Sequence, residues 1–491
     1  MRAPLRPVLL RLAAYQLAFS GIGLAGWIHR SFGDTSLDQI LWHLQYTEGA
    51  AVHMGSLFLF EFIFDVLVFP LAYALIAALV HTAAVQYFTG WKQRAVRFAP
   101  SLAGATALVL LLAQFSVFEY VRAQFEPDHF ALSYVNPRAV SLKQEQPRNL
   151  ILVYVESLEQ TYGNKTLFGS DLLASSERVG GYSFPSYEPA AGAGWTIAAM
   201  VATQCGVPLK VYTEADVRRS RAGKSFLPGA TCLGDVLQAR GYRNVFMGGA
   251  PLSFAGKGAF LQDHGYTETW GREEWEKAGA GPKDFNEWGL WDNVLYARAR
   301  KRVEELHAAG KPFNLTLLTM ETHNPIGFTS PYCRKRGARD FAGVVACADD
   351  QLSAFVKDLE ARGYLRDTAV VVLGDHLAMP NPVYEKLAKV QDERRIFNLF
   401  VADKLPPPNR QEILPFDLFP TLVELAGLDV QGDRLGLGYS AFGEAEATPP
   451  PDRAQLWSMA GLRGSPAYDS LWEQEEPAAP AASAASADAP D

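Results

Sequence analysis

Three long apolar segments lie near the N-terminus of the chain, separated by shorter polar stretches. The sequence carries no charged residue from Leu12 to Ile28, from Val66 to Val80 and from Ala99 to Phe118. Because a helix that crosses a bilayer needs about 20 mostly apolar residues, we predict three membrane-spanning helices. They are expected over residues 8–28, 60–85 and 99–119. Buried core helices of a soluble protein are the alternative, and a cleaved signal peptide is a further alternative for the first segment.

The basic residues around these segments predict their orientation. Three arginines precede or open the first segment and three basic residues separate the second from the third, whereas residues 29–54 hold one Arg and no Lys. Cytoplasmic loops of membrane proteins are enriched in Lys and Arg. The N-terminus is therefore expected in the cytoplasm, and everything after about residue 122 on the outer side.

Beyond residue 148, short apolar runs alternate with helix-like stretches such as Trp291–Ala309 and Ala346–Arg362. Continuous apolar runs are typical of strands that are buried on both faces of a parallel sheet. The runs are Asn149–Val155, Asn244–Met247, Phe313–Thr319 and Ala369–Leu373. Strands that alternate with helices predict an α/β fold, in which helices cover the sheet.

Polar residues follow three of these predicted strands. Glu156 follows the first, His323 follows the third, and Asp375 and His376 follow the fourth. Ligands of open α/β sheets bind at the carboxyl ends of the strands, so these side chains are expected at one edge. Two carboxylates and an imidazole, with one hydroxyl, would suit Mn²⁺, Mg²⁺ or Zn²⁺. Such an ion can stabilise charge on a phosphoryl group.

Two further segments carry candidate chemistry. Thr196 lies where the small-residue turn of Gly192–Met200 opens into a helix-like segment. Free backbone N–H groups at a helix N-terminus favour an anion, so Thr196 is a candidate nucleophile for a covalent phosphoryl intermediate, with a structural helix cap as the alternative. Lys257 lies in the segment Phe254–Gly258, which we expect to be a flexible loop that could close on phosphate. An ordinary surface lysine is the alternative.

At these positions the sequence resembles a known family. Glu156 after a strand, Thr196 after a Gly-rich turn and the Gly-Asp-His sequence ending at His376 resemble the sulfatase-like branch of the alkaline phosphatase superfamily. Residues 415–427 resemble the usual late segment of that branch, and the apolar N-terminus narrows the resemblance to lipoteichoic acid synthases and phosphoglycerol transferases. Three stretches are similar to the type I phosphoglycerol transferases of Gram-negative bacteria: Val155–Glu159, Gly194–Met200 with Gln204–Gly206, and Met247–Gly249 with Phe254–Gly258.

The resemblance implies a sulfatase-like fold and a set of site residues. Thr196 would be the nucleophile, His323 would bind the phosphate or serve the acceptor step, and Lys257 would contact the substrate. One divalent metal, typically manganese, would be held by Glu156, Thr196, Asp375 and His376. In the lipoteichoic acid synthases, Trp and Arg occupy the positions of Ala255 and Lys257.

The resemblance also implies the substrates and the location. Phosphatidylglycerol would be the donor and a hydroxyl of a periplasmic glucan the acceptor, for a catalytic domain in the periplasm that is anchored in the bacterial inner membrane. A phosphoethanolamine transferase of the same superfamily and a catalytically inactive, glucan-binding membrane scaffold are the alternatives. A sulfatase activity is disfavoured, because the nucleophile segment lacks the C/S-x-P-x-R maturation motif.

The four cysteines all lie in the part that is expected outside the cytoplasm. Local pairing would join Cys205 to Cys232 and Cys333 to Cys347, which suits an oxidising compartment. This is one of three possible connectivities, and four buried thiols are the alternative.

Composition adds two limits. The chain has 491 residues and a net charge of −8, so no basic surface of the kind that binds nucleic acid is expected. The last 19 residues, 473–491, hold five acidic and no basic residues and are expected to be disordered.

The expected organisation is a transmembrane region (1–122), a linker (123–148), a catalytic domain (149–445) and a C-terminal extension (446–491).

Overall fold

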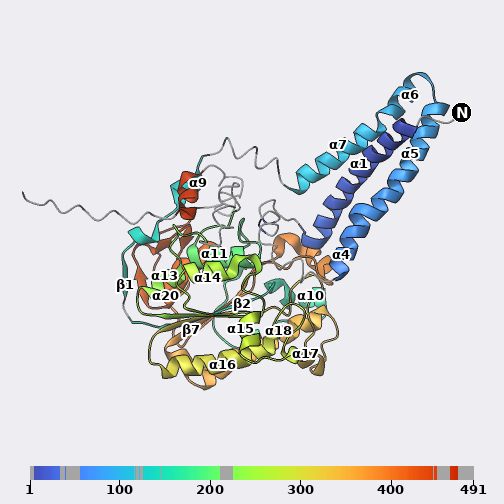
Figure 1. Cartoon of the computed structure of the whole chain (residues 1–491). Helices are drawn as coiled ribbons and strands as arrows, with labels where there is room; N and C mark the ends of the chain where they lie inside the picture. Colours follow the sequence, from blue (N-terminus) through green and yellow to red (C-terminus); the bar gives the residue numbers. More distant parts are fainter. Residues whose placement is uncertain are drawn as a thin grey trace, which may run out of the picture.

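The computed structural model consists of an α/β body and a group of long helices that projects from it (Figure 1). The structure describes residues 5–33, 39, 42, 56–115, 117, 121, 125, 127–144, 146–210, 225–445, 447–450 and 465–473. The third predicted span continues beyond the helix that ends at Gln114, and residues 116, 118 and 119 lie outside the described residues, as does the acidic tail from residue 474.

The centre of the body is a six-stranded sheet with the order β5-β4-β6-β2-β7-β8. The strands are β2 (Asn149–Val155), β4 (Arg243–Gly248), β5 (Glu268–Trp270), β6 (Phe313–Leu318), β7 (Thr368–Gly374) and β8 (Asn398–Val401). All neighbours pair in parallel except β7 and β8, which are antiparallel. The predicted α/β fold is confirmed, and the four apolar runs form β2, β4, β6 and β7. The two short edge strands were not predicted.

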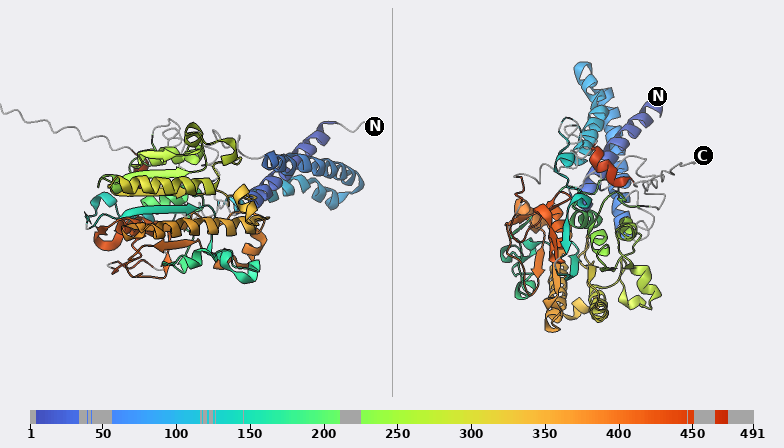
Figure 2. Two further views of the ribbon diagram at one scale, coloured as in Figure 1. Left: turned by 90° about the horizontal axis from the view of Figure 1, so that it is seen from below. Right: turned by 90° about the vertical axis from the view of Figure 1, so that its left-hand side faces the viewer.

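Helices cover both faces of this sheet (Figure 2). Leu150, Leu152 and Tyr154 of β2 belong to a core shared with α11 (Thr196–Cys205), α13 (Leu233–Gln238), α14 (Lys257–Asp263) and α20 (Leu418–Leu425). The alternating residues Ile151, Val153 and Val155 belong to a second core with α16 (Asp292–Ala308) and α18 (Phe341–Ala361). Successive strand side chains point to opposite faces, so a strand that is apolar at every position requires both helical layers.

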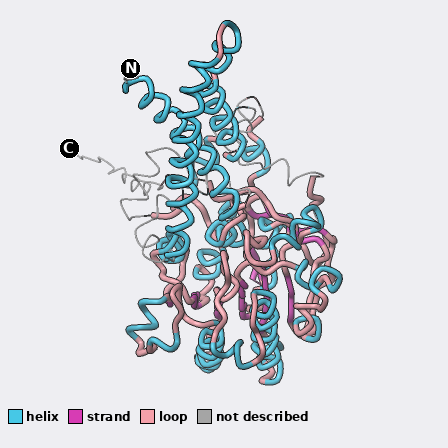
Figure 3. Tube along the Cα trace, turned by 90° about the vertical axis from the view of Figure 1, so that its right-hand side faces the viewer, coloured by secondary structure: helices cyan, strands magenta, loops and turns pink. Residues whose placement is uncertain are grey.

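Three helices at the N-terminal end are long and apolar enough to cross a membrane, judged by length and composition. They cover Arg6–Phe32, Leu59–Tyr87 and Gly90–Gln114. The elements within them are α1 (Leu5–Phe32), α4 (Ser56–Ile63), the π-helical η1 (Phe64–Val68), α5 (Phe69–Tyr87), α6 (Gly90–Arg97) and α7 (Ala99–Gln114). Large apolar side chains on these helices, such as Leu17 and Leu79, are exposed at 76% and 68%. The three helices lie side by side at one end of the molecule (Figure 3), and such apolar surfaces are typical of contact with lipid.

Two pairs of polar groups join these helices. Arg30 at the end of α1 forms a 2.6 Å ion pair with Asp65, and the hydroxyl of Tyr15 lies 2.9 Å from Nδ1 of His81. Paired polar groups are what a low-dielectric environment requires. Asp65 is therefore part of a contact that joins the first two of the long helices.

Smaller elements complete the body. They are α9 (His129–Ser133), α10 (Lys165–Phe168), α15 (Arg272–Lys277), α17 (Pro331–Lys335), α19 (Tyr384–Leu387), α22 (Pro466–Asp469), β1 (Leu142–Gln144), β3 (Ser186–Tyr187), β9 (Glu412–Ile413), β10 (Leu428–Val430), β11 (Arg434–Leu435) and β12 (Gly438–Tyr439). Within the C-terminal extension, Tyr468 is fully buried and donates a 2.7 Å hydrogen bond to the carbonyl of Pro208. Residues 465–473 thus pack onto the body.

Candidate active site

Adjacent central strands bring three potential metal ligands together. Glu156 follows β2, and Asp375 and His376 follow β7, which pairs with β2 in parallel register. All three side chains are buried, and their ligand atoms lie within 4.8 Å of one another. Nε2 of His376 lies 3.6 Å from Oε1 of Glu156 and 3.4 Å from Oδ2 of Asp375. These residues were predicted to meet at the carboxyl ends of the strands, and they lie there in the structure.

The hydrogen bonds of Asp375 and His376 use one atom of each side chain and leave the other turned toward the cluster. Oδ1 of Asp375 accepts hydrogen bonds from the backbone N–H of Ser157 (2.7 Å) and of His376 (2.9 Å). Its Oδ2 is buried without a hydrogen-bond partner among the described residues. Nδ1 of His376 lies 2.8 Å from the carbonyl of Leu377, and because a carbonyl only accepts, Nδ1 carries a proton. In the neutral ring the lone pair of Nε2 is therefore the one available to a metal. This donor set fits a divalent metal.

Thr196 is the first residue of α11, so its hydroxyl lies at a helix N-terminus. The N-cap is Trp195, and the Thr196 side chain points to the cluster instead of capping the helix. Its Oγ1 donates a 3.3 Å hydrogen bond to Oε2 of Glu156. Every residue of α11 after Thr196 is buried, which fixes the helix in the core. The hydroxyl is thus held where backbone N–H groups and a carboxylate meet.

Burial and mutual charge shift the acidity of the cluster. Burial raises the pKa of Asp375 to about 7, and the nearby Glu156 carboxylate adds to this effect. Burial acts in the same direction on Glu156, but the imidazoles of His323 and His376 and the hydrogen bonds from Ser157 and Thr196 together outweigh it, so the pKa of Glu156 is lowered. Burial disfavours the charged form of His376, yet the two carboxylates prevail and raise its pKa. The cluster therefore has excess negative charge, which a cation would neutralise.

The structure differs from the sequence expectation at Lys257. This residue begins α14 and is buried, whereas a flexible loop was predicted. Its Nζ lies 5.1 Å from the ring centroid of Phe254. Burial lowers the pKa of Lys257 to about 8, against the opposing influence of Glu156 and Asp375. The ammonium is thus a desolvated cation in the field of the cluster.

His323 contributes a half-buried imidazole on the same side. It is one of the charges that lower the pKa of Glu156, and its ring lies 4.8 Å from the ring of Trp288. Trp288 in turn lies 4.9 Å from Phe254 in an edge-to-face arrangement. Sequence reasoning missed Trp288. In the sequence, Trp288 stands out only by the glycine that follows it, in the segment between β5 and α16.

Two buried acids behind His323 were also missed. Asp292 accepts hydrogen bonds from the backbone N–H groups of Met320 (2.9 Å) and Glu321 (3.1 Å). Glu321 returns a contact, since its Oε1 accepts from the N–H of Asp292 at 3.0 Å. Burial raises the pKa of Asp292 to about 7 and that of Glu321 well above its usual range. The pair fixes the segment that leads from β6 to His323.

The cysteines form the two local pairs, Cys205–Cys232 and Cys333–Cys347. Cys205 ends α11 and Cys232 is the N-cap of α13, so the first disulfide joins the helix of Thr196 to its neighbour. Sγ of Cys333 lies 3.3 Å from Oε2 of Glu321. The first disulfide therefore joins the helix that carries Thr196, and the second contacts the segment that leads to His323.

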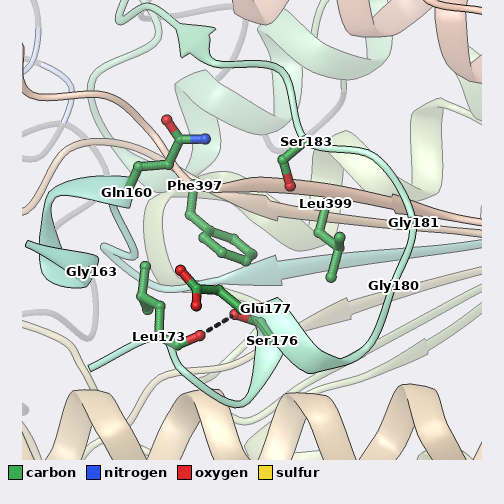
Figure 4. Close-up of a pocket in the computed structure, with 10 residues that line it drawn as sticks. All are labelled: Gln160, Gly163, Leu173, Ser176, Glu177, Gly180, Gly181, Ser183, Phe397 and Leu399. Carbon is green, nitrogen blue, oxygen red and sulfur yellow. Dashed lines mark hydrogen bonds between the residues drawn. The ribbon is translucent and has the colours of Figure 1, made fainter. Parts of the chain in front are cut away.

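A cavity of about 350 Å³ lies apart from this cluster (Figure 4). Its lining comes from the segment after β2, from the loop that precedes β3, and from Phe397 and Leu399 near the edge strand β8. Ser176 donates a hydrogen bond to the carbonyl of Leu173 in its wall. None of the predicted site residues lines this cavity.

Comparison with known proteins agrees with this architecture. A protein-family model described as Sulfatase matches residues 148–428. Phosphoglycerol transferase I from Escherichia coli O139:H28 is 36% identical over 380 residues, which cover 72% of this chain and 48% of that protein. The same protein from Shigella boydii serotype 18 gives the same values. The chain thus spans about half the length of the curated relatives it matches.

Two solved structures are similar at lower identity. The lipoteichoic acid synthase LtaP from Listeria monocytogenes is 19% identical with a TM-score of 0.48, covering 64% of this chain and 76% of that one. An alkaline phosphatase superfamily protein from Vibrio parahaemolyticus is 20% identical with a TM-score of 0.45, covering 65% and 77%. Since the family match extends over more than half of the residues, the chain belongs to the sulfatase family, in the alkaline phosphatase superfamily.

Proposed function

We propose that the protein is a membrane-anchored phosphoglycerol transferase. It would move glycerophosphate from phosphatidylglycerol to a hydroxyl of a periplasmic glucan. The observation that carries this proposal is the Thr196 hydroxyl at 3.3 Å from Glu156, beside Asp375 and His376, in a chain 36% identical to proteins named phosphoglycerol transferase I. The sequence identity to these proteins supports glycerophosphate as the transferred group. The cluster of Thr196, Glu156, Asp375 and His376 supports phosphoryl transfer as the reaction.

The reaction proceeds through two displacements at phosphorus. Thr196 Oγ1 loses its proton and attacks the phosphorus of the donor, and the bond from phosphorus to the diacylglycerol oxygen breaks. Diacylglycerol leaves with a proton, and a glycerophospho-threonine remains. The acceptor hydroxyl then loses its proton and attacks the same phosphorus, which returns Thr196 as a free hydroxyl. The phosphoryl group ends on the acceptor.

Each of the other site residues has a role in this scheme. Glu156 accepts the hydrogen bond of Thr196 and orients its oxygen. Lys257 offers positive charge to the phosphodiester. His323 binds the phosphate or takes the proton of the acceptor hydroxyl, and its half-buried position gives it access to solvent.

The cluster would hold one divalent metal through Glu156, Asp375 and His376, with Thr196 as the fourth ligand. We propose Mn²⁺, with Mg²⁺ and Zn²⁺ as alternatives. A bound ion would supply positive charge that stabilises the transferring phosphoryl group and would favour the ionised Thr196 hydroxyl.

The proposed location is the bacterial inner membrane, with the catalytic domain in the periplasm. The three apolar helices and the distribution of basic residues support this orientation. Two disulfides suit an oxidising compartment. In this orientation the catalytic domain faces the outer leaflet of the membrane, where the donor headgroup is accessible.

The test is release of diacylglycerol from fluorescent phosphatidylglycerol by the purified full chain with Mn²⁺. Thr196→Ala is expected to abolish release, whereas Thr196→Ser retains a nucleophile and part of the activity. Phosphatidylethanolamine in a parallel assay distinguishes the headgroups. Equal release by the wild type and Thr196→Ala would refute the nucleophile, and faster turnover of phosphatidylethanolamine would refute the donor.

A further inference from the structure

Trp42 lies in the sequence between the first two apolar helices, yet its side chain is buried in the core of the α/β body. It is 1% exposed. Its ring lies 5.3 Å from Phe226, which precedes α13, and 6.3 Å from Trp472 in the C-terminal extension. Burial of a large aromatic side chain stabilises the contact that it makes. This residue therefore joins the membrane region to the catalytic body.

The indole also makes a directed contact. Nε1–H of Trp42 donates a 3.2 Å hydrogen bond to the carbonyl of Ala255. Ala255 has a φ of 56°, a left-handed conformation that is unfavourable for a residue with a Cβ. Gly256 follows with a φ of 79°. Glycine adopts this conformation freely, so the strain of the turn lies at Ala255, and a strained residue persists only where surrounding contacts hold it.

This turn carries two groups of the candidate active site. Directly after it, Lys257 begins α14, with its ammonium in the field of Glu156 and Asp375. Directly before it, Phe254 lies under the Lys257 ammonium and contacts Trp288, which contacts His323. A change in the turn would therefore displace the cation and the aromatic surface together.

We propose that Trp42 is a positioning residue that holds the turn at Ala255–Gly256 in the shape required for Lys257 to meet an anionic phosphodiester headgroup. The membrane region then contributes directly to donor binding as well as anchoring the enzyme. The inference rests on the proposed function for its kinetic consequence, but the contact with Ala255 can be tested without turnover.

The chain offers a matched pair of variants. Trp42→Phe keeps an aromatic ring in the core and removes the N–H donor. Trp472→Phe makes the same chemical change in the same aromatic cluster, and Nε1 of Trp472 is buried without a hydrogen-bond partner among the described residues. The comparison therefore separates the hydrogen bond to Ala255 from aromatic packing.

Two measurements on the full chain in lipid nanodiscs test the proposal. Hydrogen exchange at the amides of residues 254–258 should accelerate about three- to tenfold in Trp42→Phe, the range expected for loss of one hydrogen bond, and stay unchanged in Trp472→Phe. The KM for phosphatidylglycerol should rise by a similar factor in Trp42→Phe only, with kcat changed less. Melting temperatures within about 2 °C of wild type would show that both variants fold.

The outcomes are distinguishable. Equal exchange in the two variants refutes the contact as a support of the turn. Faster exchange in Trp42→Phe with an unchanged KM refutes its role in donor binding. If the wild type turns over no phosphatidylglycerol, the proposed function fails, while the exchange result still decides whether Trp42 supports the turn.

Discussion

A buried ion pair holds together the two segments that carry the metal-ligand candidates. Glu159 lies three residues after Glu156, and Arg394 forms a two-pronged contact with it, through Nε at 2.9 Å and Nη2 at 2.8 Å. Nη2 also donates a 2.7 Å hydrogen bond to the carbonyl of Ala378, two residues after His376. The side chains are 2% and 0% exposed. Arg394 thus joins the segment after β2 to the segment after β7.

Replacing Glu159 with Gln is predicted to be strongly destabilising. The change leaves the guanidinium buried without its counter-charge, and removal of one partner from a buried pair costs about 3–5 kcal/mol. At about 2–4 °C per kcal/mol for a medium-sized domain, the melting temperature should fall by roughly 6–20 °C. Because both ligand segments lose a restraint, the apparent affinity for Mn²⁺ should fall as well.

The assay is thermal unfolding of the full chain in detergent, together with Mn²⁺ titration. The control is Arg362→Gln, which removes an exposed pair with Asp358 at 2.9 Å and side-chain exposures of 45% and 30%. Such surface pairs contribute little to stability, because solvent screens the two charges. Equal melting temperatures for Glu159→Gln and Arg362→Gln would refute the reasoning, as would an unchanged Mn²⁺ affinity in a destabilised Glu159→Gln variant.

Three further outcomes follow from the structure. Burial raises the pKa of Glu424 from 4.5 to about 8, so the wild type should lose stability as the pH rises from 4.5 to 8. Glu424→Gln should therefore melt a few degrees higher than wild type at pH 8.5 and at the same temperature as wild type at pH 4. An equal difference in melting temperature at both pH values would contradict this. Replacing Cys205 and Cys232 together by Ala opens a loop of 27 residues and should cost about 2–4 kcal/mol in denaturant unfolding, whereas an unchanged midpoint would show that the disulfide contributes nothing. EDTA should lower the melting temperature of the wild type and Mn²⁺ should restore it, whereas the melting temperature of Asp375→Ala should respond to neither. If Asp375→Ala responds like the wild type, Asp375 is not a metal ligand.

The central strands were predictable from sequence because each is a short run of mostly apolar residues without alternation. The run Asn149–Val155 is buried on both faces, as expected for a strand inside a parallel sheet that helices cover on both sides. Polar residues that follow such parallel strands meet at the carboxyl edge of the sheet. Glu156, Asp375 and His376 could be found in this way. The edge strand β8 has only four residues and pairs antiparallel with β7, and a segment so short carries little periodicity.

The contacts that join distant segments could not be predicted. Trp42, Trp288 and Asp292 act on residues that lie far away in the sequence, and no local pattern distinguishes them from other aromatic or acidic residues. Lys257 illustrates the same limit, because a Gly-flanked lysine resembles a mobile loop until its neighbours in space are known. Its burial follows from the packing of α14 and from the turn at Ala255.

The central claim is that Thr196 carries the glycerophosphoryl group between donor and acceptor. Peptide mass spectrometry of the full chain, quenched after mixing with phosphatidylglycerol and Mn²⁺ in the absence of acceptor, tests it most directly. We predict a glycerophosphoryl adduct on Thr196 that disappears when glucan is added. Release of diacylglycerol with no adduct at Thr196, or with an adduct on another residue, would contradict the account.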